Sequence, residues 1–242
     1  MRRYGPAVLL ALVGAAILRV SLFSELYLRY VQAGLRPYLV VSGVGLVLLG
    51  GVVGVMVVRA SGERDGHEEE SDGHSHGPAG PRVAWLLALP ALALLLFPPP
   101  ALGSYSAERE AAQRSAQGVG SFPALPSGNP LDLTLGEFGS RAVYDSSRSL
   151  KGRTLRLTGF VTRDGDGTWY VTRLLVSCCA ADATTAKAEV RGADAPPVDT
   201  WVTVTGTWHP EGQPGSDSAW PPVLDVTSVR RVPQPDNPYE KR

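Results

Sequence analysis

The chain has 242 residues, a formal net charge of zero and only two cysteines. Zero net charge gives no global attraction to nucleic acid or to an acidic surface, and two adjacent cysteines cannot form the disulfide framework of a small secreted domain. Long apolar runs fill the first hundred residues, and most of the charges lie in the last hundred or so. We therefore predict a membrane segment followed by a β-rich domain.

Three apolar runs lie in residues 1–102, at about 4–23, 38–58 and 83–102. A helix needs about 20 such residues to cross a bilayer. The first run could be a signal peptide, but a second run follows almost at once and no small-residue cleavage site precedes a polar stretch. Arg19 lies near the end of this run, where a long side chain can reach the headgroups. The sequence thus predicts about three transmembrane helices.

The second run contains Gly50 and Gly54, four residues apart. Small residues at this spacing let a neighbouring helix approach closely, although glycine is common in membrane helices in any case. The spacing is therefore compatible both with a helix-packing face and with ordinary composition.

The loop at residues 59–82 has three basic and six acidic residues, a net charge of −3, and three of the four histidines. These are His67, His74 and His76, which alternate with carboxylates and glycines. Imidazole suits zinc, so one interpretation is a loop that sequesters a divalent metal. The other is a solvated linker in which the histidines have no ligand role.

Three spans would place the two ends of the chain on opposite sides of the membrane. Basic residues flanking the spans slightly favour a cytoplasmic N-terminus. We therefore expect the C-terminal domain to be extracytoplasmic.

After a Ser-, Gly- and Pro-rich linker at 103–130, which includes a candidate polar helix at 107–117, the predicted domain covers 131–242. Helical spacing of apolar residues predicts a helix within 131–144. Asp164 and Asp166 belong to an Asp-Gly turn that favours a hairpin rather than a calcium loop. Five strands of this length suit an OB-like β-barrel, with a small sandwich as the alternative. The strands are expected at 154–162, 169–177, 187–191, 201–208 and 223–232.

Cys178 and Cys179 lie where the second of these strands ends. Adjacent side chains of a regular strand point to opposite faces, so both thiols can bind one ion only if the backbone turns between them. Such a turn would combine the two thiolates with Asp182 into a soft ligand set for zinc or another thiophilic ion. The alternative is that one cysteine is a small core residue and the other fills the loop.

Several segments together resemble a known family: Leu35-Arg36-Pro37, KGRTLRLTGFV at 151–161, RLLVSCCAADA at 173–183, and the strand at 201–208 that runs through a glycine. On these residues the chain resembles the YcgQ-like family of bacterial membrane proteins, which have a few N-terminal spans and a C-terminal OB-like domain. Such proteins are paired with a multi-spanning permease similar to the arsenic-efflux permeases. The resemblance implies a multi-pass protein of a bacterial plasma membrane with an accessory role in transport.

The main functional hypothesis is an accessory subunit of a membrane permease, for a thiophilic metal ion such as zinc. The alternative is a surface thiol-based sensor of metal or arsenite, or a redox module, without a transport role. Nucleic-acid binding is not expected, because residues from 130 onward hold thirteen basic and fourteen acidic side chains with no basic stripe. An enzyme is not expected either, because no nucleophile elbow, phosphate loop or acid–base pair is found, and His209 looks like a loop residue.

Overall fold

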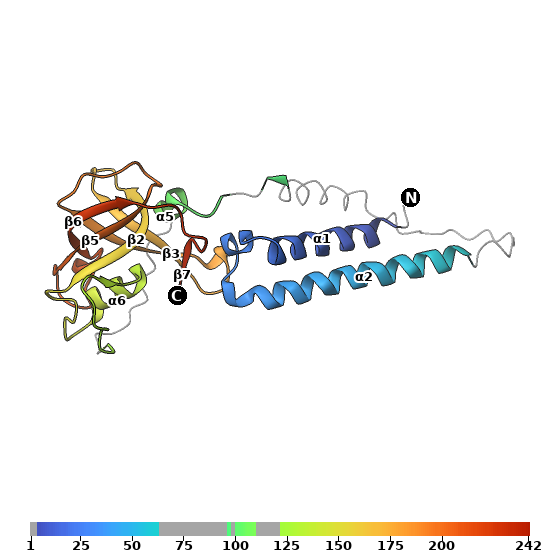
Figure 1. Cartoon of the computed structure of the whole chain (residues 1–242), viewed down its shortest axis with the longest axis horizontal. Coiled ribbons are helices and arrows are strands. Elements are labelled where there is room, and N and C mark those ends of the chain that lie inside the picture. The colour runs from blue at the N-terminus through green and yellow to red at the C-terminus, as the bar shows by residue number, and fades with distance from the viewer. Residues whose placement is uncertain (1–3, 63–95, 98–99, 110–121) are drawn as a thin grey trace. The chain divides into compact units, whose positions relative to one another are not determined.

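The structure, a computed structural model, describes residues 4–62, 96–97, 100–109 and 122–242 (Figure 1). The chain divides into two compact units. The first comprises Met1–Tyr27 and Ala33–Pro100, and the second comprises Leu28–Gln32 and Ala101–Arg242. A short segment between the first two helices therefore belongs to the C-terminal unit.

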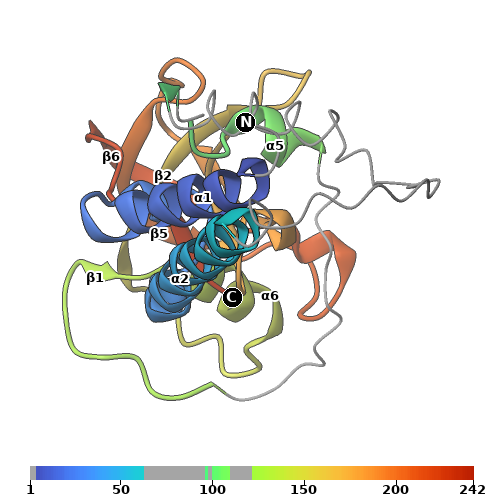
Figure 2. The same cartoon turned by 90° about the vertical axis from the view of Figure 1, so that its right-hand side faces the viewer.

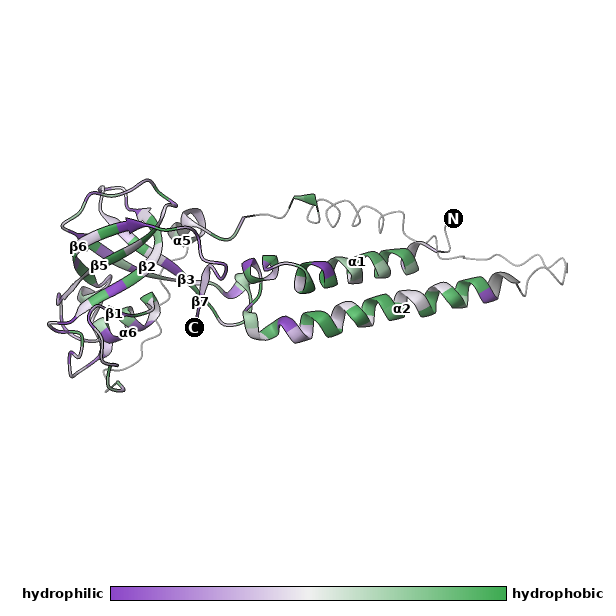
Figure 3. Ribbon diagram, viewed as in Figure 1, coloured by the Kyte–Doolittle hydropathy of each residue, from purple (hydrophilic) through white to green (hydrophobic). Residues whose placement is uncertain are grey.

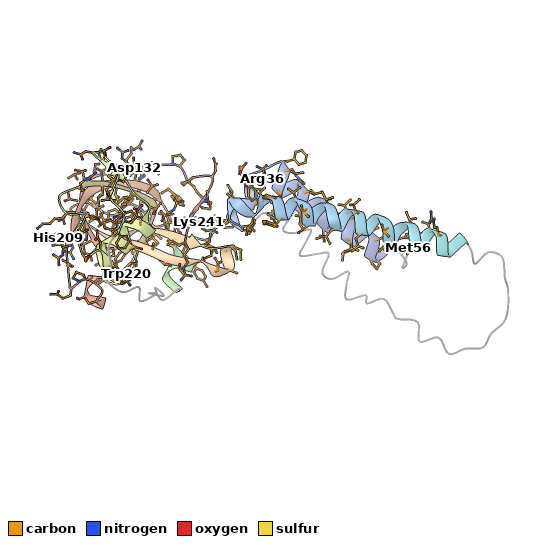
Figure 4. All side chains as sticks on the ribbon, turned by 90° about the horizontal axis from the view of Figure 1, so that it is seen from below. Arg36, Met56, Asp132, His209, Trp220 and Lys241 are labelled. Carbon is orange, nitrogen blue, oxygen red and sulfur yellow. The ribbon has the colours of Figure 1, made fainter. Side chains whose placement is uncertain are left out.

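Helices α1 (Gly5–Leu22) and α2 (Arg36–Gly62) form the described part of the first unit and run side by side (Figure 2). Both are long and apolar enough to cross a membrane, and most of their residues are hydrophobic (Figure 3). Many of these side chains are exposed, including that of Met56, which projects from α2 (Figure 4). Two short 3-10 turns, η1 (Leu26–Arg29) and η2 (Ala33–Leu35), lie between the helices.

The described residues contain two such helices rather than the three expected from the apolar runs. The two correspond to the runs at 4–23 and 38–58. Most of the third run, at 83–102, lies outside the described residues, as do His67, His74 and His76.

Glycines let α1 and α2 approach closely. A Cβ added to Gly14 would lie 2.7 Å from the carbonyl oxygen of Gly43, and one added to Gly50 would lie 2.8 Å from that of Ala7. A Cβ on Gly51, the next residue, would meet nothing within 4 Å. Of the two interpretations of the glycine spacing, the helix-packing face is the one that the structure supports, with α1 as the neighbouring helix.

The C-terminal unit is a strand-rich sheet domain with seven strands in the order β1-β2-β5-β6-β4-β3-β7, and β2 also pairs with β3. Five of the strands match the expected ones closely, and two short strands at the ends of the domain are additional. The bounds are β1 (Leu131–Asp132), β2 (Thr154–Arg163), β3 (Trp169–Val176), β4 (Thr184–Arg191), β5 (Trp201–His209), β6 (Val223–Arg231) and β7 (Tyr239–Lys241).

Most neighbouring strands are antiparallel. The exceptions are the parallel pairs β1–β2, β4–β6 and β3–β7. Because β2 contacts both β5 and β3, the pairings β2–β5–β6–β4–β3–β2 follow one another in a ring. Strand β3 also pairs with β7, so the end of β3, after which the two cysteines follow, lies beside the last strand of the chain.

Helix α6 (Leu135–Tyr144) closes one side of the core. It lies within the expected range 131–144, and the first two residues of that range, Leu131 and Asp132, pair with β2. Thr134 is its N-cap, and the hydroxyl of Thr134 accepts a hydrogen bond from the backbone N–H of Glu137 at 3.1 Å. The apolar face of α6 packs against the sheet, where its fully buried residues include Leu135 and Phe138. In the linker, α5 (Ser104–Arg109) overlaps the first residues of the polar helix expected at 107–117, and the rest of that helix, from residue 110, lies outside the described residues.

Candidate dithiol site

The two cysteines lie on a bend that leaves β3. Strand β3 ends at Val176, Ser177 and Cys178 form the bend, and a 3-10 turn, η4 (Ala180–Asp182), leads into β4. Small side chains and an aspartate fill this stretch, and residues 177–182 are exposed or partly buried, so the almost fully buried run of β3 ends here. The bend replaces the regular strand geometry that would have sent the two side chains to opposite faces.

As a result, both sulfurs lie on the same side of the loop. The Sγ atoms of Cys178 and Cys179 are 3.5 Å apart, within hydrogen-bond distance of each other. Both cysteines are free; Cys178 is exposed and Cys179 is partly buried. The alternative in which one cysteine is a core residue is therefore wrong for this loop, because neither belongs to the described hydrophobic clusters.

Asp182 fixes the shape of the loop. Its Oδ1 accepts a hydrogen bond from the backbone N–H of Ser177 at 2.9 Å, and its Oδ2 accepts one from the backbone N–H of Cys178 at 2.8 Å. These bonds lower the pKa of the Asp182 carboxyl, together with a hydrogen bond from the Cys178 side chain, which is the largest cause. The carboxylate therefore stays charged and turns the backbone back on itself at the point where the thiols meet.

The same carboxylate controls the Cys178 thiol. Hydrogen bonding to Asp182, followed by hydrogen bonding to Cys179, raises the pKa of Cys178 from 9.0 to about 11. The thiol is therefore protonated at neutral pH, when it is a weaker nucleophile and has to lose a proton before it can ligate an ion. Capture of a cation at this pair is thus expected to release protons and to strengthen as the pH rises.

The predicted three-residue ligand set is only partly assembled. Among the described residues, no group of three or more His, Cys, Asp or Glu side chains is arranged to hold a metal ion. The two sulfurs are together, whereas both Asp182 oxygens are already hydrogen-bonded to backbone N–H groups of the loop. The pair therefore offers two sulfur ligands, and Asp182 organises the loop that carries them.

Sequence reasoning missed the partner of this loop. Val31 forms an isolated antiparallel β-bridge with Cys179, from a segment about 150 residues earlier in the chain. The N–H of Gln32 donates to the carbonyl oxygen of Cys178 at 3.0 Å, and the N–H of Ala180 donates to the carbonyl oxygen of Tyr30 at 2.8 Å. We call Leu28–Gln32 the connector segment. No local pattern signals this pairing, because a single bridge has no hydrophobic period.

Two side chains reinforce the bridge at its edges. The Nε2 of Gln32 donates to the carbonyl oxygen of Val176 at 2.9 Å, and the hydroxyl of Tyr239 donates to the carbonyl oxygen of Arg29 at 2.9 Å. Burial raises the pKa of the Tyr239 hydroxyl, so it stays a donor at neutral pH. The connector segment is thus held both by the backbone of the cysteine loop and by the last strand.

A buried ion pair supports β7 next to the site. Glu240 accepts hydrogen bonds from the backbone N–H groups of Leu135 and Gly136, at 3.0 and 2.9 Å, at the start of α6. Its Oε1 lies 3.8 Å from Nε of Arg173, whose guanidinium lies 4.9 Å from the centroid of the Trp201 ring. Burial raises the pKa of the Glu240 carboxyl. This arrangement ties β3, β7 and α6 together beneath the loop.

His209 (labelled in Figure 4) ends β5, and its ring pairs with Asp225 and Glu211. Its Nδ1 is 2.8 Å from Oδ2 of Asp225, and Glu211 is paired with Arg191. All four side chains are largely exposed. They form a solvated polar network. The expectation that His209 is a loop residue is wrong, because His209 is the last residue of β5 and pairs with Val223 of β6. Asp164 and Asp166 likewise lie in the hairpin turn before β3.

The sheet domain has a counterpart among known families. No curated protein and no solved structure matches the chain. A match to a family model begins at the fifth residue of α6 and ends within β7. It includes the strands from β2 to β6 and the cysteine loop, but neither α1 nor α2. Residues 139–240 match the family model described as the DUF1980 C-terminal domain.

Proposed function

We propose that this protein is a membrane-anchored accessory subunit of a multi-spanning permease, and that Cys178 and Cys179 capture a thiophilic ion such as zinc for that permease. The observation that carries the proposal is the 3.5 Å separation of the two sulfurs on an exposed loop. Soft thiolates select zinc and copper(I) over hard cations. The family resemblance of the loop sequence supports the permease as the partner.

The separation favours a bent coordination geometry. Two thiolates bound to one tetrahedral zinc at about 2.3 Å would lie about 3.8 Å apart, whereas a linear two-coordinate ion with the same bond length needs about 4.6 Å. The observed 3.5 Å is within a few tenths of the tetrahedral value. A tetrahedral zinc ion held by these two thiolates would keep two open positions, one more than in zinc sites with three protein ligands. An open site suits delivery to a partner more than permanent storage.

Membrane topology supports the same role. The connector segment, which lies between α1 and α2 in the chain, belongs to the same compact unit as residues 101–242. If both helices cross the membrane, the chain ends α2 on the side opposite to that unit and has to return before residue 101. The apolar run at 83–102 lies in this interval, which supports a third crossing. We assign the domain to the extracytoplasmic side of a bacterial plasma membrane.

The domain itself suits protein contact rather than catalysis. The ring of strand pairings supports an OB-like arrangement, in which β4 and β6 form the parallel pair. Its residues from 130 onward carry nearly balanced charge, so phosphate binding is not favoured. The accessory role accordingly needs no reaction carried out by this chain.

Two measurements test the proposal. The full chain in detergent is incubated with one equivalent of zinc, desalted and analysed by native mass spectrometry, alongside Cys178→Ser/Cys179→Ser and the matched control Ser177→Ala. We expect zinc on the wild type and the control but not on the double variant. Co-purification with a co-expressed candidate permease of the multi-spanning type tests the partner. A chain that retains no zinc at about pH 8, or never associates with the permease, would refute the corresponding half.

The orientation has its own test. A membrane-impermeant maleimide added to intact cells should label Cys178, because this cysteine is exposed. Labelling that appears only after lysis would place the domain on the cytoplasmic side.

A second candidate is a thiol-based sensor of metal or arsenite without a transport role. The β-bridge between Val31 and Cys179 favours it, because a change at the cysteines has a direct route to the connector segment. In that case the chain would bind the ion but would not associate with a permease, and the two measurements above separate the candidates.

A further inference from the structure

The cysteine loop and the connector segment share one peptide group. The peptide that joins Cys178 to Cys179 has the carbonyl oxygen of Cys178 as its acceptor, and this oxygen accepts the N–H of Gln32 at 3.0 Å. The same peptide is part of the eight-membered ring that a disulfide between adjacent cysteines would close. Chemistry at the sulfurs and pairing with the connector segment are therefore coupled through a single peptide plane.

Metal chelation and disulfide formation by the two thiols require different orientations of this peptide plane. A bent chelate needs the sulfurs about 3.8 Å apart, close to their present 3.5 Å, so the backbone can stay as it is. A disulfide needs them about 2.05 Å apart, with a dihedral near 90°. Cys179 has an extended backbone, with φ −155° and ψ 170°, so closing the small ring requires the peptide plane to rotate.

We propose that oxidation of Cys178 and Cys179 to a vicinal disulfide loosens the connector segment from the loop, whereas binding of a thiophilic ion leaves the segment bridged. Rotation of the shared peptide turns the Cys178 carbonyl oxygen away from Gln32 and displaces the neighbouring N–H of Ala180 from Tyr30. The inference rests on the proposed function only in taking the two thiols as the reactive groups of the loop.

The oxidant is a small disulfide, R–S–S–R. The Cys179 thiolate attacks one of its sulfurs, forms a mixed disulfide and expels RS⁻. Cys178 then loses its proton and attacks Sγ of Cys179, which expels the second RS⁻ and closes the ring. The two cysteine protons neutralise the two released thiolates. The dithiol loses two electrons and the small disulfide gains them.

The loosening is local, because two contacts do not involve the shared peptide. The Gln32 side chain still reaches the carbonyl oxygen of Val176, and the Tyr239 hydroxyl still reaches that of Arg29. The connector segment thus stays attached at its edges while its central bridge opens. Opening of a partly attached segment is reversible when a reductant restores the thiols.

Hydrogen–deuterium exchange of the full chain in detergent tests this inference, with samples that are reduced, oxidised with glutathione disulfide, or loaded with zinc. Oxidation should remove the mass of two hydrogen atoms and accelerate exchange of the Gln32 and Ala180 amides about fivefold to tenfold, as for loss of one hydrogen bond each. Peptides from β5 should not change. Zinc should leave both amides as protected as in the reduced chain.

Cys178→Ser/Cys179→Ser provides the matched control, because it keeps the backbone bridge and cannot form the ring. Its exchange should not respond to glutathione disulfide. Unchanged protection of Gln32 in a chain that has lost two hydrogen atoms would overturn the inference, and so would failure to form the disulfide at about pH 9. Failure to retain zinc would overturn the metal-bound half of the inference together with the proposed function, whereas the oxidised sample tests the disulfide half independently.

Discussion

Replacing Asp182 by Asn is the most informative single change at the dithiol. The carboxylate is the largest cause of the high Cys178 pKa, about 11 against an ordinary 9.0. Asn keeps one oxygen to accept from the loop amides but has no charge and favours the thiol form less. We therefore expect the pKa of Cys178 to fall toward its ordinary value and one of the two hydrogen bonds from the loop amides to be lost.

The size of the effect follows from the thiolate population. At pH 8 a thiol with a pKa of about 11 is about 0.1% thiolate, and one with the ordinary pKa of 9.0 is about 9% thiolate, a rise of roughly a hundredfold. A less basic thiolate is also a weaker nucleophile, by about 0.4–0.5 logarithmic units per pKa unit, which removes about tenfold. The alkylation rate of Cys178 should therefore rise about tenfold.

The assay measures the iodoacetamide alkylation rate of Cys178 as a function of pH in a Cys179→Ser background, so that a single thiol is followed. We expect the midpoint of the profile to move by one to two pH units on Asp182→Asn. Asp166→Asn, a turn carboxylate that caps Thr168, is the matched control and should have no effect. A midpoint that does not move in Asp182→Asn would refute the assignment of the high pKa to this carboxylate.

Three further predictions concern stability. Glu240→Gln leaves the buried Arg173 without a counter-charge and should lower the free energy of unfolding by about 2–3 kcal/mol. Chemical unfolding of the full chain, followed by tryptophan fluorescence, measures this loss. The control Asp132→Asn removes a carboxylate from an exposed ion pair and should cost under about 0.5 kcal/mol. Gly50→Ala should destabilise the helix pair by roughly 1–3 kcal/mol in an SDS titration, because its Cβ would meet the backbone of α1; an equal loss in Gly51→Ala would contradict this. Burial opposes ionisation of Asp145, but hydrogen bonds from Ser147 and Ser149 outweigh this effect and lower the pKa of its carboxyl to about 2. About 1–2 kcal/mol of stability that is present above pH 4 should therefore be lost as the pH falls from about 4 to 2. In Asp145→Asn the stability should depend less on pH in this range.

Local patterns in the sequence were sufficient for the main elements of the domain. The Asp-Gly turn after Arg163 fixed the hairpin, and alternation of apolar residues located the five longer strands to within about three residues. The apolar runs likewise located α1 and α2. These features succeed because each depends on residues that are close in the chain.

The short strands and the connector segment could not be found in this way. Strands of two or three residues, such as β1 and β7, are too short to show a period, and their parallel pairing depends on distant partners. The bridge from Val31 to Cys179 is a single contact between segments far apart in sequence. Such pairings are selected by the folded core rather than by local preference.

The roles within the dithiol site were partly predictable. Strand alternation left open whether the two thiols could meet, and the bend at Ser177 and Cys178 decided it. Asp182 was expected as a ligand because carboxylates accompany thiolates in metal sites. It instead accepts the backbone N–H groups four and five residues earlier in the chain, because an aspartate side chain can bond to nearby backbone donors.

Mutation can separate the thiol chemistry of Cys178 and Cys179 from their backbone link to the connector segment. The backbone groups of this pair carry the link to the connector segment, and the side chains carry the thiol chemistry. Replacement of both sulfurs by hydroxyls removes the chemistry but leaves every backbone donor and acceptor of the bridge in place. A double serine variant that fails to bind zinc yet protects Gln32 normally would therefore locate the function in the thiols, whereas a variant that loses both would show that the sulfurs are needed for the loop to fold.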